Sequence, residues 1–554
     1  MFASQPSESD LLQFALNLEF LEADFFLNIA LGHGLDVIAP GLAEGGPPPA
    51  GGHMAKLDSL TKDVITQFGY TEDKCLLTSW IKQAFGRPLS PPFDPCANSI
   101  NFLLAAYAIL YVGFNGLVDS VQYCKMSHSR STRTTVRVTP LGACVQLVAG
   151  ILGVETGQDG VIRAMLYEQY VTVAEFTNRI SNFRNKLGNE GIKDEGLVVP
   201  RTEGAKGIIS GNVLAAEKIH FHIPEILRIV YGGNERVPGC FLTTLNIMIR
   251  SSFLVVLLTS LLLLLLIPRS YSSEINVTQT YTSPKFEYAL LEFPLNIQYL
   301  VAEFYLIGAK GYGLDAFAPG LAQGGPPPIG GQKANLDPLT KDFSLQNGLV
   351  ATGHLRAIKR AVKGFPRPLI NLNKELFAQI VDQAFGQPLN PPFDPYANSL
   401  NYQLAAYITT LVGPDMYVGI IPKLQNTESK EVFAGLLGAA SGGQTSIRAY
   451  LYERWDSPVP PYKVTVAEFT NRIAERANKL GMEGTKTEGI VVPPWNGAEG
   501  KVSGNVIEAD KYSLSYGRTP EEILRISYGS GNETIPGGFY PHGANGRIAQ
   551  YYFN

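Results

Sequence analysis

The sequence predicts an all-α protein made of two tandem copies of one helical bundle. A chain of 554 residues is too long for a single hydrophobic core. The same motifs occur twice in the same order, and the most apolar stretches have the length of bundle helices. Hydrophobic residues make up 45% and charged residues 17%, which is typical of a globular protein. With 56 Gly and 37 Pro, much of the chain must lie in long ordered loops.

The duplication is visible in four motifs: a GLAxGGPPPxGG loop, PPFDP, VTVAEFTNRI and SGNV. Their paired positions are 41–52 with 320–331, 91–95 with 391–395, 171–180 with 464–473, and 210–213 with 503–506. Matches this long in one order indicate a repeat. They place copy 1 at residues 8–240 and copy 2 at residues 285–554.

Copy 1 is the incomplete copy, because the spacing between paired motifs changes along the chain. Residues 64–83 correspond to the longer stretch 343–383, so copy 1 lacks about one helix. Copy 1 also carries an irregular insertion at about 120–146 that is basic and rich in Ser and Thr. This stretch resembles translated non-coding sequence, and a surface insertion is the alternative.

A hydrophobic segment, 248–273, joins the two copies. Its uninterrupted apolar core, 253–267, would span roughly 22 Å as a helix at about 1.5 Å per residue. That is shorter than the roughly 30 Å hydrocarbon core of a bilayer. Arg250 precedes this core, and small polar residues follow it, as in a secretory signal peptide. A membrane anchor and a buried core helix are the alternatives.

If the segment directs secretion, copy 2 is extracellular or apoplastic; if it is an anchor, the protein is held at a membrane. Two glycosylation sequons, at Asn276 and Asn532, agree with secretion. A third explanation is that the chain merges two neighbouring genes in one gene model.

Buried carboxylates are the candidate metal ligands of copy 1. Glu19 and Glu22 lie three residues apart on the nearly all-apolar helix predicted at 11–31. Glu155 lies on a second predicted helix, three residues before Gln158. Helical bundles bind iron or manganese pairs with one Glu from each of two helices and Glu-x-x-His pairs from the other two. The alternative is that these glutamates are satisfied polar residues paired with Arg163 or a lysine.

Copy 2 has neutral residues at the matched positions. Gln298, Val301 and Ala440 stand where copy 1 has Glu19, Glu22 and Glu155. Copy 2 adds His354, within a helical stretch that copy 1 lacks. The predicted metal ligands Glu19, Glu22, Glu155 and His354 therefore form an incomplete set, split between the copies.

The most specific strings are GGPPPxGG, GHLRAIKR, PPFDPYANS, VTVAEFTNRI and the closing RTPEEILRISYGSGNETIPGGFYPHGANGRIA. In these the chain resembles the plant desiccation-related proteins of the ferritin-like superfamily, almost end to end in both copies. The resemblance implies two ferritin-like four-helix bundles with long Gly/Pro-rich loops, and accumulation under water stress, often in the cell wall or apoplast.

The function predicted from these residues is a non-catalytic, secreted stress protein without a cofactor that protects or binds other macromolecules. The alternative is a metal-binding protein or oxidoreductase that uses iron or manganese. No basic run or Arg-aromatic stripe favours nucleic-acid binding. Cell-wall material, other proteins or a second copy of the chain are the partners left open. The five cysteines follow no zinc pattern and are expected to be buried thiols.

Overall fold

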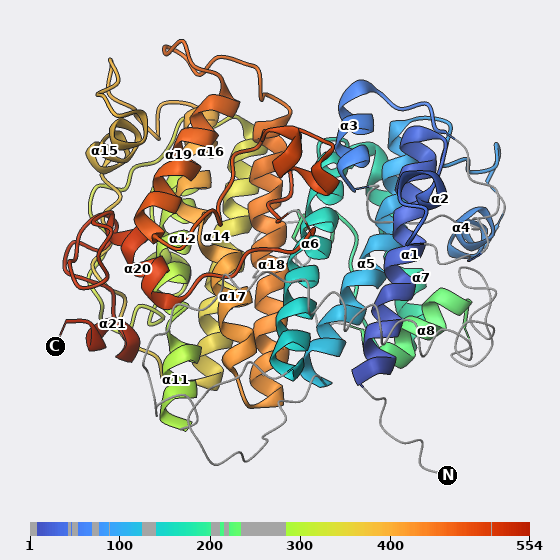
Figure 1. Cartoon of the computed structure of the whole chain (residues 1–554), viewed down its shortest axis with the longest axis horizontal. Helices are drawn as coiled ribbons and strands as arrows, with labels where there is room; N and C mark the ends of the chain where they lie inside the picture. The colour runs from blue at the N-terminus through green and yellow to red at the C-terminus, as the bar shows by residue number, and fades with distance from the viewer. Residues whose placement is uncertain are drawn as a thin grey trace.

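The computed structural model describes residues 8–42, 46, 54–68, 77–87, 89–123, 140–200, 211–214, 221–233, 284–510 and 512–553. Within these residues the chain is helical, and its only β structure is a few isolated bridges. The helices of copy 1 gather on one side of Figure 1 and those of copy 2 on the other. Helices α6 and α18 lie side by side between them. The prediction of an all-α fold is confirmed.

Copy 2 forms a closed bundle of long helices. These are α12 (Leu295–Lys310), α14 (Pro338–Ala361), α16 (Ser399–Thr410) with α17 (Gly413–Ile420), and α18 (Thr427–Tyr452). Helix α12 packs on α14 and α16, and α18 contacts the same two helices, which closes the ring. The remaining elements are α11 (Pro284–Glu292), α13 (Leu314–Phe317), α15 (Lys374–Phe385), α19 (Val466–Gly481), α20 (Pro520–Tyr528), α21 (Arg547–Tyr551) and the short 3₁₀ turns η2 (Ile421–Lys423), η3 (Pro494–Asn496) and η4 (Ala498–Gly500).

Among the described residues of copy 1, three helices have 24 residues or more: α1 (Glu8–Leu31), α5 (Ser99–Tyr123) and α6 (Pro140–Tyr167). Its shorter helices are α2 (Leu35–Ile38), α3 (Ser59–Phe68), α4 (Leu77–Phe85), α7 (Tyr170–Gly188) and α8 (Ile223–Tyr231). Helix α5 packs between α1 and α6. Helix α3 has 10 residues where the matched α14 has 24, so no full-length counterpart of α14 occurs among the described residues of copy 1.

Two prolines explain why copy 2 divides helices that run unbroken in copy 1. Pro294 separates α11 from α12, and the matched position in α1 is Ala15. Pro414 lies at the start of α17, and the matched position in α5 is Phe114. Proline has no backbone N–H and its ring clashes with the preceding turn. Alanine and phenylalanine allow the helix to continue.

Several predicted segments fall wholly or partly outside the described residues. The hydrophobic segment 248–273 and Asn276 are not described, nor are residues 124–139 of the expected insertion. The two ends of that insertion belong to α5 and α6. Of the cysteines, Cys96 and Cys144 are described, and both are buried.

Two described stretches, Ser99–Val118 and Ser399–Lys423, are long and apolar enough to cross a membrane. The fold buries 83% and 94% of their most apolar windows, respectively. Both are therefore accounted for as core helices of the bundles.

Candidate metal centre

The centre of the copy 1 bundle contains the three predicted carboxylates. Glu22 and Glu155 are each only 2% exposed. Burial raises the pKa of Glu19 well above its ordinary value, and the nearby charge of Glu155 raises it further. Helices α1 and α6 thus bring Glu19 and Glu155 close together. The Glu22 carboxylate lies against Gly113 of α5, where any side chain would collide with it.

The next turn of α6 adds polar groups to this centre. Gln158, which stands where a Glu-x-x-His pair would need histidine, donates a long hydrogen bond of 3.4 Å to Glu155. Asp159 is buried one position later, and burial raises its pKa to about 6. Arg163 does not pair with the predicted glutamates. Its guanidinium donates instead to the backbone carbonyls of Asn212 and Val213, each at 2.6 Å.

The centre of the copy 2 bundle is built from neutral groups. The His354 Nδ1 lies 3.1 Å from Gln298 Oε1, and the Gln298 amide donates at 3.1 Å to the Tyr417 hydroxyl. Burial lowers the pKa of His354 to about 4, which keeps the imidazole neutral. The His354 Nε2 has no hydrogen-bond partner in the described part of the chain. His354 also lines a cavity of about 40 Å³ whose wall includes Val301 and Ala440.

The four predicted ligands therefore do not form one site. Glu19, Glu22 and Glu155 belong to copy 1, whereas the cavity at His354 is lined by copy 2 residues alone. Among the described residues, no group of three or more His, Cys, Asp or Glu side chains is arranged to hold a metal ion.

A model of the ferritin-like domain family matches residues 7–168 and 287–453. The chain belongs to this family. The ferritin-like catalase Nec2 of Nesocodon mauritianus is 53% identical over 261 residues, which is 47% of this chain and 84% of that relative. The desiccation-related protein PCC13-62 of Craterostigma plantagineum is 50% identical over 264 residues, 48% of this chain and 84% of the relative. No solved structure matches the chain.

These alignments confirm the resemblance to desiccation-related proteins and the presence of two ferritin-like copies. Each one covers about half of this chain but most of the relative. The matched relatives therefore correspond to a single copy.

The ferritin-like copies also contain buried charges that were not predicted. In copy 2, the Arg518 guanidinium lies 3.2 Å from both Asp415 and Glu522, and Lys486 also pairs with Glu522 at 2.9 Å. In copy 1, Lys193 pairs with Glu225 in the matched place. The sequence feature that could have predicted these ion pairs is the recurrence of Lys and Glu at matched repeat positions. These charges are internally paired, so they are structural.

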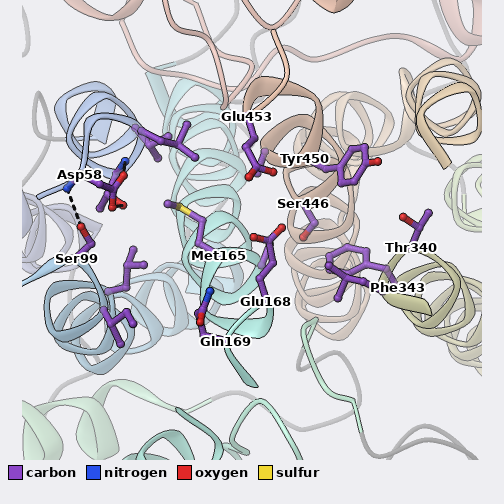
Figure 2. Close-up of a pocket in the computed structure, with 18 of the residues that line it drawn as sticks. Asp58, Ser99, Met165, Glu168, Gln169, Thr340, Phe343, Ser446, Tyr450 and Glu453 are labelled. Carbon is purple, nitrogen blue, oxygen red and sulfur yellow. Dashed lines mark hydrogen bonds between the residues drawn. The ribbon is translucent and has the colours of Figure 1, made fainter. Parts of the chain in front are cut away.

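A cleft of about 240 Å³ lies between the two ferritin-like copies, near the carboxyl ends of α6 and α18 (Figure 2). Glu168 and Glu453 point toward each other across it (Figure 2). Burial raises the pKa of Glu168, and the charge of Glu453 adds to this effect. Met165 and Tyr450 also stand at matched repeat positions. The cleft is therefore formed where equivalent faces of the copies meet.

The sequon residue Asn532 lies partly exposed in a surface turn. Its Oδ1 accepts hydrogen bonds of 2.8 Å from both the backbone N–H and the hydroxyl of Thr534. Glycosylation at Asn532 and at Asn276 stays a prediction.

Proposed function

We propose that this chain is a desiccation-associated ferritin-like protein with a non-catalytic role, and that it acts by binding or protecting other macromolecules. The relative named as a desiccation-related protein supports the association with drying. The neutral centre of copy 2, the copy with a closed bundle, supports the non-catalytic role.

The chemistry of that centre carries the proposal. A pair of divalent cations in a dry bundle needs several anionic ligands to offset its charge. Copy 2 offers the amide Gln298, the apolar Val301 and Ala440, and one neutral imidazole at His354. A single imidazole cannot compensate four positive charges at low dielectric. The residues of copy 2 do not fit a two-metal centre.

Metal analysis of the purified full-length chain tests this proposal. After exhaustive dialysis, we expect less than about one iron or manganese ion per copy, because a ferritin-like two-metal centre would hold two. The Glu19→Gln, Glu22→Gln, Glu155→Gln triple variant is the matched control and should give the same low value. Two tightly bound ions per copy in the unmodified chain would refute the non-catalytic role.

A second candidate function is metal binding, with redox activity, by copy 1 alone. The observation that favours it is the convergence of Glu19, Glu22 and Glu155, which supply the hard oxygen ligands that manganese accepts. One relative is named as a ferritin-like catalase, so the redox activity proposed for this candidate is that of a catalase. In the part of copy 1 that the structure describes, no long helix supplies a histidine, so its ligand set is smaller than the family pattern requires.

Matched substitutions in the two copies separate the candidates. If copy 1 holds a metal, Glu155→Gln should remove bound manganese and any manganese-dependent consumption of peroxide. The matched substitution in copy 2, Ala440→Gln, should then change neither. Equal, background-level results for both variants and the unmodified chain would leave the non-catalytic role as the function.

Secretion and partner binding form part of the same proposal. The signal-like segment 248–273 supports export of copy 2, and cell-wall material or proteins are the proposed partners. Amino-terminal sequencing of apoplastic material should find copy 2 beginning close after Ser273. Recovery of one intact chain in the membrane fraction would favour an anchor instead. Absence of transcript reads that span the codons for Cys240 to Met248 would favour two separate gene products.

A further inference from the structure

Two hydrogen bonds between the copies use the same pair of repeat positions in opposite directions. The Tyr167 hydroxyl at the end of α6 donates to the Asp342 carboxylate of α14. The Tyr452 hydroxyl at the end of α18 donates to the Asp63 carboxylate of α3. Tyr167 matches Tyr452, and Asp63 matches Asp342, in the repeat alignment. The reciprocity is that of a two-fold, isologous dimer interface.

A second reciprocal pair lies one helical turn further along. The backbone N–H of Val213 in copy 1 donates to the Gln346 side chain of copy 2 at 2.9 Å. The backbone N–H of Val506 in copy 2 donates to the Gln67 side chain of copy 1 at 3.0 Å. Val213 matches Val506, and Gln67 matches Gln346. One approximate two-fold axis thus relates these four hydrogen bonds in two pairs.

Small residues allow α6 and α18 to approach closely at the centre of this interface. The Ser441 hydroxyl of α18 donates to the Gly153 carbonyl of α6 at 2.5 Å. In the reciprocal position, Thr156 of α6 lies against Gly438 of α18, where a Cβ atom would be 3.1 Å from the Thr156 methyl carbon. A larger residue at Gly438 would push against α6. A Cβ atom on Gly153 would instead collide with the Ser515 hydroxyl oxygen, so a larger residue there would displace Ser515.

One position breaks the symmetry. Gly160 of α6 corresponds to Thr445 of α18. A Cβ atom on Gly160 would lie 2.7 Å from the Gly442 Cα and 2.8 Å from the Thr445 hydroxyl. Carbon atoms do not approach so closely, so the contact requires glycine on the copy 1 side. Two copies of α18 would bring a threonine to this place instead.

We propose that the two ferritin-like copies form a non-covalent pseudo-dimer that does not need the connecting segment, and that Gly160 makes copy 1 the preferred partner of copy 2. The reciprocal hydrogen bonds give the two copies a common orientation. The Gly160–Thr445 pair gives the interface its preference for the mixed pair over a pair of copy 2 domains. This proposal is independent of whether either centre binds a metal.

The first test cuts the full chain. A protease site is placed between residues 234 and 283, the purified protein is cleaved, and native mass spectrometry identifies the species. We expect one copy 1 fragment bound to one copy 2 fragment. Separate fragments after cleavage would overturn the non-covalent association, and a predominance of copy 2 homodimers would overturn the preference.

The second test changes Gly160. In the cleaved chain, Gly160→Thr should weaken the association of the fragments by at least about tenfold, because it overpacks a contact that has no spare room. Gly435→Thr is the matched control, since Gly435 lies on α18 with no neighbouring atom near its Cβ position. Equal affinities for the two variants would overturn the role of Gly160.

A pair of conservative variants keeps the proposal testable if Gly160→Thr fails to fold. Tyr167→Phe and Tyr452→Phe each remove one of the two equivalent hydrogen bonds while retaining the ring. Both should weaken the cleaved pair, and by similar factors. An effect from only one of them would show that the interface is not two-fold.

Discussion

At the residue scale, one fully buried arginine secures the loops of each copy to its bundle. The Arg448 guanidinium on α18 donates four hydrogen bonds of 2.6–3.0 Å to backbone carbonyls. The acceptors belong to Glu488, Gly489, Asn505 and Val506. Arg163 occupies the matched position on α6 and makes the same kind of contacts. Loops without regular structure thereby satisfy their buried carbonyl groups.

Replacing Arg448 with methionine should therefore destabilise copy 2 strongly. The substitution keeps much of the apolar stem but leaves several buried carbonyls without a donor, and Glu508 without its cation 3.6 Å away. We expect a loss of about 3–5 kcal/mol in the free energy of unfolding, measured with urea. Arg472→Met, at an exposed surface ion pair, should cost less than about 1 kcal/mol. Similar losses for both variants would contradict this account.

A second residue-scale prediction concerns pH. Burial and the neighbouring negative charge of Glu508 together raise the pKa of Glu488 from 4.5 to about 7. The fold thus favours the protonated acid, so its stabilising contribution is complete below pH 4.5 and is lost as the pH rises through about 7. The loss is at most about 4 kcal/mol, at roughly 1.4 kcal/mol per pKa unit.

Thermal melting from pH 5 to pH 8 measures this effect. Glu488→Gln mimics the protonated acid and should reduce the fall in melting temperature over that range. The exposed Glu468→Gln serves as the control and should keep the fall of the unmodified chain. An unchanged pH profile for Glu488→Gln would refute the assignment.

A residue-by-residue comparison of the repeats misses one compensating exchange. In copy 1, Arg184 of α7 pairs with Asp194 at 2.5 Å. Copy 2 has Ala477 and Thr487 at these positions, and Arg518 from a later segment donates to Thr487 at 2.7 Å. The guanidinium near this turn is retained but comes from a different part of the chain. Copy 2 thus lacks both Arg184 and Asp194 and gains Arg518. Only a structure shows that these changes are connected.

At the scale of the helix, equivalent aspartates, Asp58 and Asp337, cap the matched helices α3 and α14. Asp337 accepts a hydrogen bond of 2.9 Å from the Thr340 N–H, and Asp58 accepts one of 2.8 Å from the Thr61 N–H. Both are N-caps that satisfy an otherwise unpaired donor. Neighbouring hydrogen bonds lower the pKa of both carboxyls, although their burial opposes this.

Removing either N-cap should reduce the stability of the protein by a similar amount. We expect Asp337→Ala and Asp58→Ala each to lower the free energy of unfolding by about 1 kcal/mol. Asp→Asn at the same positions should restore most of the loss, since asparagine also caps helices. Chemical denaturation of the full chain measures both. A neutral effect of Asp337→Ala would show that α14 is fixed by packing alone.

The helices and the repeat could be predicted because each produces a pattern that can be read from the sequence without knowledge of the packing. Long apolar stretches predict α1 and α5, and repeated motifs predict two copies. The close packing of α6 on α18 could not be predicted in this way. Gly153 and Gly160 lower helix propensity. Their lack of a side chain makes room only for residues 250 or more positions away, Ser515 and Gly442 respectively. Likewise, Glu19 and Glu22 could be placed in a bundle, but the burial of Asp159 depends on tertiary packing.

At the scale of the whole molecule, α6 is a core helix shared by both copies. It packs on α5 of its own copy and on α18 of the other. Leu152 and Val161, which are nine residues apart and therefore lie on opposite faces of α6, are both almost fully buried. Helix α18 also contacts α5, so copy 2 covers a face that copy 1 cannot cover with its short α3.

Residues 1–245 expressed alone should therefore be unstable or aggregate. Removal of copy 2 exposes the apolar and glycine-rich side of α6 and removes the partners of Tyr167 and Val213. A large exposed apolar patch on a bundle with a shortened helix promotes association. We expect binding of a hydrophobic dye, a broad thermal transition and soluble aggregates in size-exclusion chromatography. The full chain is the control and should melt cooperatively. A monomeric 1–245 fragment with one sharp transition would contradict this, because it would show that copy 1 completes its core without α18.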